Sequence, residues 1–547
     1  MGTTVLVVVI KNEKLTVIVR VAKYLTEPKL LGYQQDKTIR FWQTYHSRFC
    51  CYRSSINIIP LITLTASCGR VFFESFVLAA LSVLKSGVNN PACAIDLHSP
   101  WTMSAGSTYG SYKFNVLHHL TGISPYFESN SEGLNPDPPQ DCTIDRVAYL
   151  LRHGALYVNE YDYVSIIEPF LQRLKNASNY VKFSESTDLS FLTHWTSPVS
   201  NSREQIAKLS KLGYLEAFSL GTRLAYRYPN LMPTAKDTSF KVWGSNANRT
   251  KHSAEALFAG LFAGHETIGK MVNVSENSDR GADTLTPTRS CPNFDVSKGT
   301  RQADVWLKNY AVPIIARLNA KVPGFHFSAH DVMAMQELCG YETIIRGSSL
   351  FCGIFTSEEW LSFEYYFDIK YYYELGYGND LSPTLGMPWL VATSDLLAHA
   401  KANDQRLYIS VAHRQIPPLI LTALGLFNDS EYLGTSNVNP VLPLDKINYQ
   451  RAWKTSSFIS FLSQIALERL NCKSTAYNGS YVRILVNSVP KPLPGCVSGP
   501  SDSCPLKQFT DYVKQRHKQY EDFTKACGVK NKNVPDAMTF FVKEQTV

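Results

Sequence analysis

The sequence lacks three features that would place it in a familiar class at once. The eight cysteines beyond residue 100 include no Cys-x-x-Cys pair, which argues against a structural zinc site. No internal repeat occurs, so a repeat architecture is not indicated. No apolar run beyond residue 94 is long enough to cross a bilayer, and we expect no stable membrane span in the mature protein. No pattern in the sequence calls for a metal ion or an organic cofactor.

Net positive charge is low in most of the chain, although the whole sequence carries a formal charge of +8. Residues 1–70 hold ten Lys and Arg but three Asp and Glu, so they contribute +7, and all the remaining residues contribute +1. The body of the chain therefore offers no broad basic surface, and we expect no nucleic-acid partner. With 547 residues and 44% hydrophobic content, the chain is long enough for a large core and two domains.

The N-terminal segment, residues 1–94, resembles a targeting segment but is irregular. Two apolar stretches of signal-sequence length occupy residues 54–68 and 71–84, and a small-x-small cleavage pattern, Ala92-Cys93-Ala94, follows them. About seventy residues precede the second stretch, which is too many for an ordinary signal peptide. Either the start codon is mis-assigned or an intron is retained in the gene model, or the segment anchors the protein in a membrane. We favour a faulty N-terminus that contains a signal-like stretch.

Cysteines and glycosylation sequons together indicate the secretory route. The eight cysteines that follow residue 100 are an even set, which is typical of a disulfide framework. Five Asn-x-Ser/Thr sequons lie in the same region, at Asn176, Asn248, Asn273, Asn428 and Asn478. One sequon is weak evidence, but five sequons beside an even cysteine set favour an oxidising compartment. We therefore expect a secreted glycoprotein that is extracellular or lies in the cell wall.

Short apolar runs between longer helical patterns predict an α/β fold. The runs at 146–151, 407–412 and 481–487 have the length and the apolar content of buried strands. We therefore expect a mainly parallel sheet flanked by helices. Apolar residues recur at helical spacing over three longer segments, 201–227, 251–271 and 302–348.

Domain boundaries follow from the same patterns. Residues 95–141 are rich in Ser, Gly, Pro and Asn, which predicts an irregular N-terminal arm. We expect the α/β domain to comprise residues 142–190 and 380–547. Residues 191–379 are mostly helical in pattern and are expected to form an inserted domain.

Two histidines directly follow predicted strands. His153 comes after the run at 146–151, and His413 comes after the run at 407–412. Because the carboxyl ends of parallel strands line the ligand crevice of an open α/β sheet, these side chains are expected to meet. Arg152 precedes the first histidine and Gly154 follows it. A neutral imidazole beside an arginine is suited to attack a phosphate group, because the planar guanidinium binds the phosphate oxygens.

Three segments of the sequence carry a family resemblance. They are Arg152-His153-Gly154, then Asn248-Arg249-Thr250-Lys251-His252-Ser253-Ala254-Glu255, then Ala412-His413-Arg414. They resemble the motifs of the histidine acid phosphatase family, branch 2 of the histidine phosphatase superfamily, which includes fungal acid phosphatases and phytases. The resemblance runs from about residue 110 to the C-terminus. It implies a phosphoglycerate-mutase-like α/β fold and no cofactor.

The resemblance also implies roles for individual residues. Arg152 and Arg249 would hold phosphate, His153 would attack it, and His413 would support the transferring group. The cysteine spacing agrees with the fungal phytases, since Cys142 lies eleven residues before His153. The disulfides implied by the resemblance are Cys142–Cys472, Cys291–Cys527, Cys339–Cys352 and Cys496–Cys504.

The sequence departs from the family pattern at three positions. The second arginine and the proline of the opening motif are replaced by Leu156 and Val158, and the acid that follows the second histidine is Arg414. We hypothesise that Arg414 takes over phosphate clamping. Glu160 and Asp162 are candidates for the proton donor. The alternative is that both are ordinary carboxylates of a surface loop. Without a general acid, hydrolysis of esters with poor leaving groups should slow by roughly 10²–10⁴-fold.

The sequence therefore predicts a secreted acid phosphatase that hydrolyses phosphate monoesters through a phosphohistidine, with phytate among the candidate substrates. The expected partner is a small-molecule phosphate monoester. Because of the departures at Leu156 and Arg414, an alternative is a catalytically weakened homologue that binds phosphorylated ligands. A mutase of the wider superfamily is a further alternative, but the cysteines, the sequons and the chain length argue against it.

Overall fold

The computed structural model describes residues 3–11, 14–22, 108–109, 112–127, 134–233, 240–263, 268–399, 405–429 and 442–543. Two compact units divide the chain, residues 1–100 and residues 101–547. In the first unit, strand β1 (Thr3–Lys11) pairs antiparallel with β2 (Lys14–Ala22). The signal-like stretches and the pattern Ala92-Cys93-Ala94 lie outside the described residues.

The second unit is built around one sheet with strand order β11-β10-β9-β5-β8-β6-β7, in which β12 also pairs with β10. The neighbours β5, β8, β6 and β7 pair in parallel, whereas β9 to β12 pair antiparallel. The predicted α/β fold with a mainly parallel sheet core is therefore confirmed. The strands are β5 (Cys142–Arg152), β6 (Lys241–Ser245), β7 (Lys270–Val274), β8 (Leu407–Ala412), β9 (Gln464–Lys473), β10 (Asn478–Val486), β11 (Val489–Pro490) and β12 (Cys504–Pro505), with a separate pair β3 (Thr108–Tyr109) and β4 (Tyr112–Lys113).

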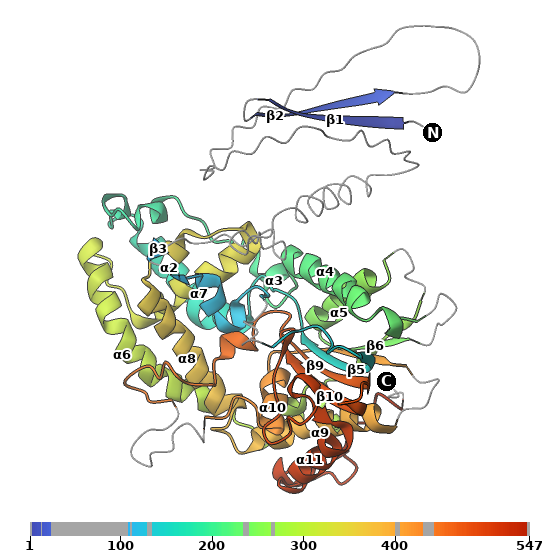
Figure 1. The fold of residues 1–547 in the computed structure, drawn as a ribbon. Coiled ribbons are helices and arrows are strands. Elements are labelled where there is room, and N and C mark those ends of the chain that lie inside the picture. The colour runs from blue at the N-terminus through green and yellow to red at the C-terminus, as the bar shows by residue number, and fades with distance from the viewer. Residues whose placement is uncertain are drawn as a thin grey trace. The chain divides into compact units, whose positions relative to one another are not determined.

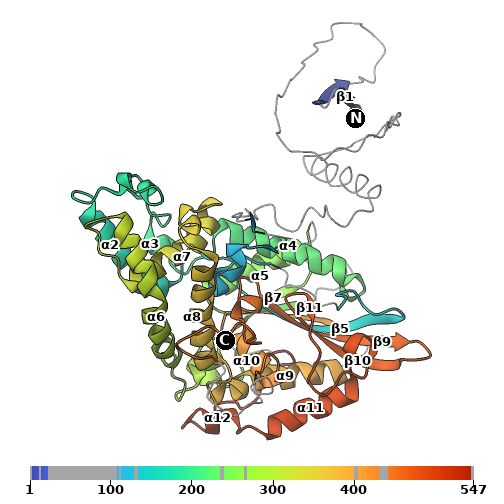
Figure 2. The same ribbon diagram turned by 60° about the vertical axis from the view of Figure 1, so that its left-hand side comes forward.

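Helices cover both faces of this sheet (Figures 1 and 2). α4 and α5 lie on one face, and α9 and α10 lie on the other. The helices are α2 (Glu168–Ala177), α3 (Ser202–Gln205), α4 (Lys211–Arg227), α5 (Asn248–Leu261), α6 (Lys298–Lys321), α7 (Ala329–Arg346), α8 (Ser357–Leu375), α9 (Leu381–His399), α10 (Ile416–Leu424), α11 (Leu506–Lys518) and α12 (Phe523–Ala526). A π-helical segment, η3 (Asp162–Ile167), leads into α2, and the short turns η1 (Val116–His119) and η2 (Thr121–Ile123) precede β5. Among the described residues, every helix is too short or too polar to cross a membrane.

The second half of the central strand β5, residues 147–151, is apolar without interruption. Val147, Tyr149 and Leu151 pack with Leu257 of α5 on one face of the sheet. The alternate residues, such as Leu150, pack on the opposite face with the core that includes α9 and α10. Successive side chains of a strand point to opposite faces, so a strand covered on both sides must be apolar at every position. Because both faces are buried, the pairing register of β5 is fixed. Its carboxyl end therefore lies at a defined position on the edge of the sheet.

The region predicted as a helical insertion, residues 191–379, divides differently in the structure. It contains α6, α7 and α8, which pack together beside the sheet (Figure 1). It also contains β6 and β7, which are strands of the main sheet. Each of these strands has five residues and is followed or preceded by a strong helical pattern, so neither stood out in the sequence. The sheet therefore extends into the segment that was assigned to the insertion.

Four disulfides cross-link the second unit. Cys142–Cys472 joins residues that lie opposite each other in β5 and β9. The others link Cys291 to Cys527, Cys339 to Cys352 and Cys496 to Cys504. These are the four pairings that the family resemblance implies. A native disulfide typically contributes about 2–5 kcal/mol to the free energy of unfolding, so this set stabilises the fold around the sheet.

Candidate active site

Four parallel strands bring polar side chains to one edge of the sheet. β5 ends in Arg152, with His153 next, and His413 follows β8. Ser245 ends β6, and Glu276 lies two residues beyond the end of β7. The carboxyl ends of parallel strands are where open α/β sheets bind their ligands. The structure thus brings the two predicted histidines together, with their ring centroids 5.8 Å apart.

His153 is fixed by its backbone and by its ring. Its N–H donates to the carbonyl oxygen of Ala412 at 2.9 Å, and its own carbonyl accepts from the N–H of Leu462 at 3.3 Å. Ring atom Nδ1 lies 2.9 Å from the carbonyl oxygen of Gly154. Because a carbonyl oxygen accepts but does not donate, Nδ1 carries the proton and Nε2 holds a free lone pair. This is the nucleophilic tautomer of imidazole.

The side chain of Arg152 is completely buried beside this histidine. Its Nη1 donates to the carbonyl oxygens of Gly122 and Ile459, both at 2.6 Å, and its guanidinium carbon lies 4.2 Å from the ring centroid of Phe461. Its Nε and Nη2 have no hydrogen-bond partner in the described part of the chain. Burial, followed by the nearby Arg414, lowers the pKa of Arg152 to about 9. Two unpaired N–H groups on a buried cation are suited to bind an anion.

His413 has a hydrogen-bond partner on each ring nitrogen. Nε2 lies 2.8 Å from Oε1 of Glu276 and 3.1 Å from Oγ of Ser245. Nδ1 accepts from Nε of Arg249 at 3.2 Å. Since arginine only donates and a carboxylate only accepts, His413 is the neutral tautomer with its proton on Nε2. Burial lowers the pKa of His413 to about 4, against the opposing effect of Glu276, which agrees with this assignment.

Glu276 is the acceptor that organises this edge of the sheet. Its Oε1 accepts from His413, from the Ser245 hydroxyl and from the N–H of Ala247, the last at 3.1 Å. Its Oε2 lies 2.7 Å from Nη1 of Arg289. Burial would raise the pKa of Glu276, but the hydrogen bonds from His413 and Ser245, together with Arg289, lower it to about 2. Glu276 is therefore ionised and holds His413 in one orientation.

Arg249 and Arg414 add two further guanidinium groups. Arg249 lies in the first turn of α5. The guanidinium carbon of Arg414 lies 5.7 Å from the ring centroid of Tyr371, and among the described residues Arg414 has no hydrogen bond or ion pair. Burial acts to lower the pKa of Arg414, but Tyr371 and Asp162 outweigh it and raise the pKa, so the group stays cationic.

The same arginines act on the ring of His153. Burial, then Arg152 and Arg249, holds the pKa of His153 well below its ordinary value. A buried imidazole between cations resists protonation, because its charged form is poorly solvated and is repelled by its neighbours. His153 is therefore neutral in mildly acidic solution.

The two proposed proton donors differ in their surroundings. Glu160 is exposed, whereas Asp162 is buried at the start of the π-helical segment η3. Oδ2 of Asp162 accepts from the hydroxyl of Tyr341 and from Nδ2 of Asn159, the latter at 3.2 Å. The Asp162 carboxylate is thus bonded to α7 rather than to either histidine. Glu337 of α7 is another buried carboxyl, and burial, followed by Asp162, raises its pKa well above the usual range.

The replaced positions of the opening motif belong to the core. Leu156 and Val158 are fully buried. Leu156 forms an isolated antiparallel bridge with Leu209, and Val158 forms a parallel one with Ile206. These bridges hold the segment after His153 against the chain that leads into α4. The site therefore has no cation at position 156, and Arg414 is the added cation.

Sequence reasoning missed Ser245 and Glu276. Both depend on β6 and β7, which were not recognised as strands. The run Lys241–Ser245 has β-branched and aromatic residues, and it ends where the motif with Arg249 begins. A search for short strands before that motif would have found Ser245. Glu276 has no comparable local signal, because its role arises only when β7 lies beside β6.

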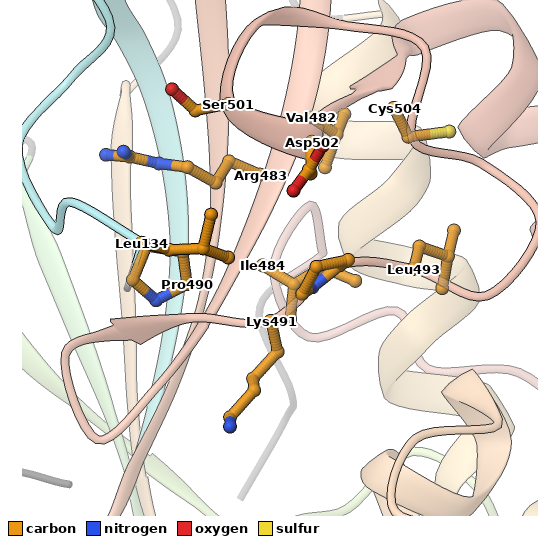
Figure 3. Close-up of a pocket in the computed structure, with 11 residues that line it drawn as sticks. Leu134, Val482, Arg483, Ile484, Pro490, Lys491, Leu493, Ser501, Asp502 and Cys504 are labelled. Atoms are coloured by element: carbon orange, nitrogen blue, oxygen red, sulfur yellow. The ribbon is translucent and has the colours of Figure 1, made fainter. Parts of the chain in front are cut away.

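A small cavity lies at the opposite edge of the sheet, around β10, β11 and β12 (Figure 3). Its cations are engaged elsewhere: Arg483 forms an ion pair with Glu468 at 2.6 Å, and Nζ of Lys491 lies 5.6 Å from the ring centroid of Phe427. In Figure 3 the Lys491 side chain extends away from the other labelled residues. This cavity is therefore a poor site for a phosphate group. The residues that line it are Leu134, Val482, Arg483, Ile484, Pro490, Lys491, Pro492, Leu493, Ser501, Asp502 and Cys504.

Within the described ranges, no group of three or more His, Cys, Asp or Glu side chains is arranged to hold a metal ion. The groups that surround His153 are mainly arginines, which repel cations and attract anions.

Known proteins resemble this chain over most of its length. The family model of the histidine phosphatase superfamily (branch 2) matches residues 143–487. The acid phosphatase PHO1 of Komagataella pastoris is 30% identical over 435 residues, which cover 78% of this chain and 90% of that protein. The phytase PHO112 of Candida albicans is 31% identical over 440 residues, with coverage of 78% and 90%. The crystal structure of the phytase from D. castellii matches with a TM-score of 0.69 and 25% identity, over 84% of this chain and 96% of that one.

The low pKa of Glu276 predicts how its contribution to stability depends on pH. The pKa is about 2 in the folded protein and 4.5 for an unperturbed glutamate, so the folded state binds the proton less tightly than the unfolded chain. The carboxylate therefore stabilises the fold above about pH 4.5, and this contribution is lost as the pH falls through 2. Glu276→Gln should be less stable than the natural protein at pH 7 in urea denaturation, and the difference should shrink below pH 4.5. Glu255→Gln, an exposed change on α5, is the control, and a pH-independent difference for Glu276→Gln would contradict the prediction.

Proposed function

The chain belongs to branch 2 of the histidine phosphatase superfamily and is a phosphoric monoester hydrolase, and on that basis we propose that it works through a phosphohistidine at His153. One observation carries this proposal. A neutral, buried imidazole with its lone pair on Nε2 lies beside a group of arginines, and Arg152 has no partner for its Nε and Nη2 among the described residues. A phosphate monoester supplies the anion that these arginines need and the phosphorus atom that Nε2 attacks.

The proposed reaction has two steps. Nε2 of His153 attacks phosphorus and displaces the alcohol, and water then attacks the phosphohistidine and releases phosphate. Arg152 and Arg249 neutralise the charge on the phosphoryl oxygens, which is the main requirement of phosphoryl transfer. His413, held by Glu276, supports the group as it is transferred. The lowered pKa of His153 keeps the nucleophile neutral at acid pH.

Arg414 is proposed as the third phosphate ligand. Its guanidinium is held near Tyr371 by a cation–π contact and has no competing hydrogen bond or ion pair with a described residue. The nearby Asp162 keeps it charged. It thereby supplies the cation that the buried Leu156 cannot supply.

The substrate class that we propose is phosphate monoesters in general, with phytate among them. Curated relatives carry the names acid phosphatase and phytase, which supports both. Because Arg414 replaces the acid that the family has after the second histidine, an alternative function is that of a weakened homologue that binds phosphorylated ligands. Assays of an aryl phosphate and of phytate over the acid pH range distinguish these functions.

The proposed location is outside the cell. The four disulfides support passage through an oxidising compartment. All five sequon asparagines are exposed, as glycan attachment requires: Asn176, Asn248, Asn273, Asn428 and Asn478.

Secretion predicts glycans on these asparagines. The protein produced in a eukaryotic secretory host should lose mass on treatment with an N-glycosidase. Substitution of all five sequon asparagines by Gln should abolish that loss, whereas Asn246→Gln, an exposed asparagine outside any sequon, should not change it. A protein that carries no glycan and keeps free thiols in such a host would contradict the proposed location.

Removal of the nucleophile predicts loss of turnover. His153→Ala should lower the hydrolysis of p-nitrophenyl phosphate at acid pH by more than about 10³-fold, because no phosphoenzyme forms. An alkaline quench during turnover should trap phosphate on His153 of the natural protein, as located by mass spectrometry. His252→Ala changes a histidine that stacks on Tyr214 instead and should keep the activity. Absence of turnover in the pure, folded natural protein would instead support the weakened homologue.

The proposed role of Arg414 predicts weaker phosphate binding when its side chain is removed. A hydrogen bond to a charged group contributes about 1.5–3 kcal/mol, so Arg414→Ala should lower kcat/KM by about 10- to 100-fold. The inhibition constant of inorganic phosphate should rise in parallel. Arg301→Ala removes an exposed arginine that pairs with Asp295, and it serves as the control. Unchanged phosphate affinity and turnover in Arg414→Ala would refute the clamping role.

A further inference from the structure

The hydroxyl of Tyr371 is a buried polar group that the mechanism above leaves unused. Tyr371 lies on α8, and its side chain is completely buried. Its hydroxyl has no hydrogen-bond partner among the described residues. Buried hydroxyl groups are normally paired, so an unpaired one calls for a ligand or a function.

Tyr371 lies near two of the proposed phosphate ligands. A methyl group added to Gly122 would lie 3.3 Å from the Tyr371 hydroxyl and 3.9 Å from Nη1 of Arg152, so both groups flank the same glycine. The guanidinium carbon of Arg414 lies 5.7 Å from the centroid of the tyrosine ring. Tyr371, with its unpaired hydroxyl, and Arg152, with its unpaired Nε and Nη2, thus lie against the same glycine.

The hydroxyl keeps its proton in this environment. Burial raises the pKa of Tyr371 to about 12, although Arg414 and, more weakly, Arg152 act to lower it. The group is therefore a neutral donor when the enzyme is free. Its anion would be stabilised by the same two arginines, because opposite charges in a buried site interact strongly.

We propose that the Tyr371 hydroxyl protonates the departing oxygen of the substrate, in place of the carboxylic acid that is missing after His413. This inference rests on the proposed phosphohistidine mechanism. It assigns the acid to a residue on α8, far in sequence from both histidines.

The proton and the electron pairs balance over the two steps. As Nε2 of His153 bonds to phosphorus, the P–O ester bond breaks, and the departing oxygen takes the Tyr371 proton to become an alcohol. Tyrosinate remains between Arg152 and Arg414. Water then attacks phosphorus, the P–N bond breaks, and the water gives one proton to the tyrosinate. Phosphate leaves, and His153 and Tyr371 return to their starting states.

The other acidic side chains fit this role less well. Glu160 is exposed, and Asp162 is bonded to Tyr341 and Asn159. Burial raises the pKa of Glu337 well above its usual range, and the charged groups that act on it are Asp162, Lys370 and then Arg414. Tyr371 is the one of these groups that lies against Arg414 and beside Arg152.

The test is the dependence of the reaction on the leaving group. Tyr371→Phe retains the ring that contacts Arg414 and removes the O–H group alone. Its kcat/KM for an alkyl phosphate should fall by about 10²–10⁴-fold, the range for loss of a general acid. Its kcat/KM for p-nitrophenyl phosphate should fall far less, because nitrophenolate departs without a proton. Across a series of aryl phosphates, the plot of log kcat/KM against leaving-group pKa should therefore be steeper for the variant than for the natural enzyme.

Two controls separate this role from a structural one. Tyr373→Phe removes the hydroxyl of a half-buried tyrosine on the same helix and should leave the slope unchanged. Glu337→Gln should also leave the slope unchanged. An equal loss on all substrates, or no loss, in folded Tyr371→Phe would overturn the inference, and a steeper slope in Glu337→Gln would assign the acid to that residue. If the natural enzyme forms a phosphoenzyme at His153 while the Tyr371 result is negative, only this inference fails, whereas absence of the phosphoenzyme removes the proposed mechanism itself.

Discussion

The parallel pairing of β5 with β8 is the constraint on which the candidate site depends. It continues one residue past the end of β5, since the backbone N–H of His153 donates to the carbonyl oxygen of Ala412, the residue before His413. The two histidines, 260 positions apart, are therefore held together by main-chain hydrogen bonds rather than by their side chains. β6 and β7 extend the same arrangement and bring Ser245 and Glu276 alongside. Because the strands are buried on both faces, a shift of register would expose apolar side chains, and this cost fixes the geometry of the site.

Electrostatics then decides what this geometry is suited to bind. Arg249 and Arg414 both act to lower the pKa of Arg152, and Arg414 also acts to lower the pKa of Arg249. Cations brought this close repel one another, and burial adds a further cost. Glu276 relieves part of the cost on the side of His413, and Asp162 relieves part on the side of Arg414. A bound anion with several oxygen atoms would offset the remaining cost of bringing these cations together. The arginines of the free site are therefore suited to bind phosphate, as proposed.

The sequence predicts some parts of this arrangement and not others. The strand before His413 was predicted at 407–412, which are the bounds of β8, because a run buried on both faces is apolar throughout. β9 was not predicted, since it carries Glu468, which pairs with Arg483 inside the protein, although the predicted strand at 481–487 falls on its antiparallel partner β10. Glu276 and Tyr371 are ordinary polar residues in the sequence. Their significance comes from neighbours that only the fold supplies.

The replacement at position 414 changes which kind of acid the site can use. A carboxyl group in contact with these arginines would lose its proton at acid pH, because neighbouring cations favour the charged form. A phenol has a much higher intrinsic pKa, so Tyr371, at about 12, keeps its proton beside the same cations. An alkoxide is a stronger base than tyrosinate, and transfer of the proton to the departing oxygen is therefore favourable. Arg414 thus stands in the sequence position of the usual acid, and its positive charge also makes a tyrosine the better proton donor.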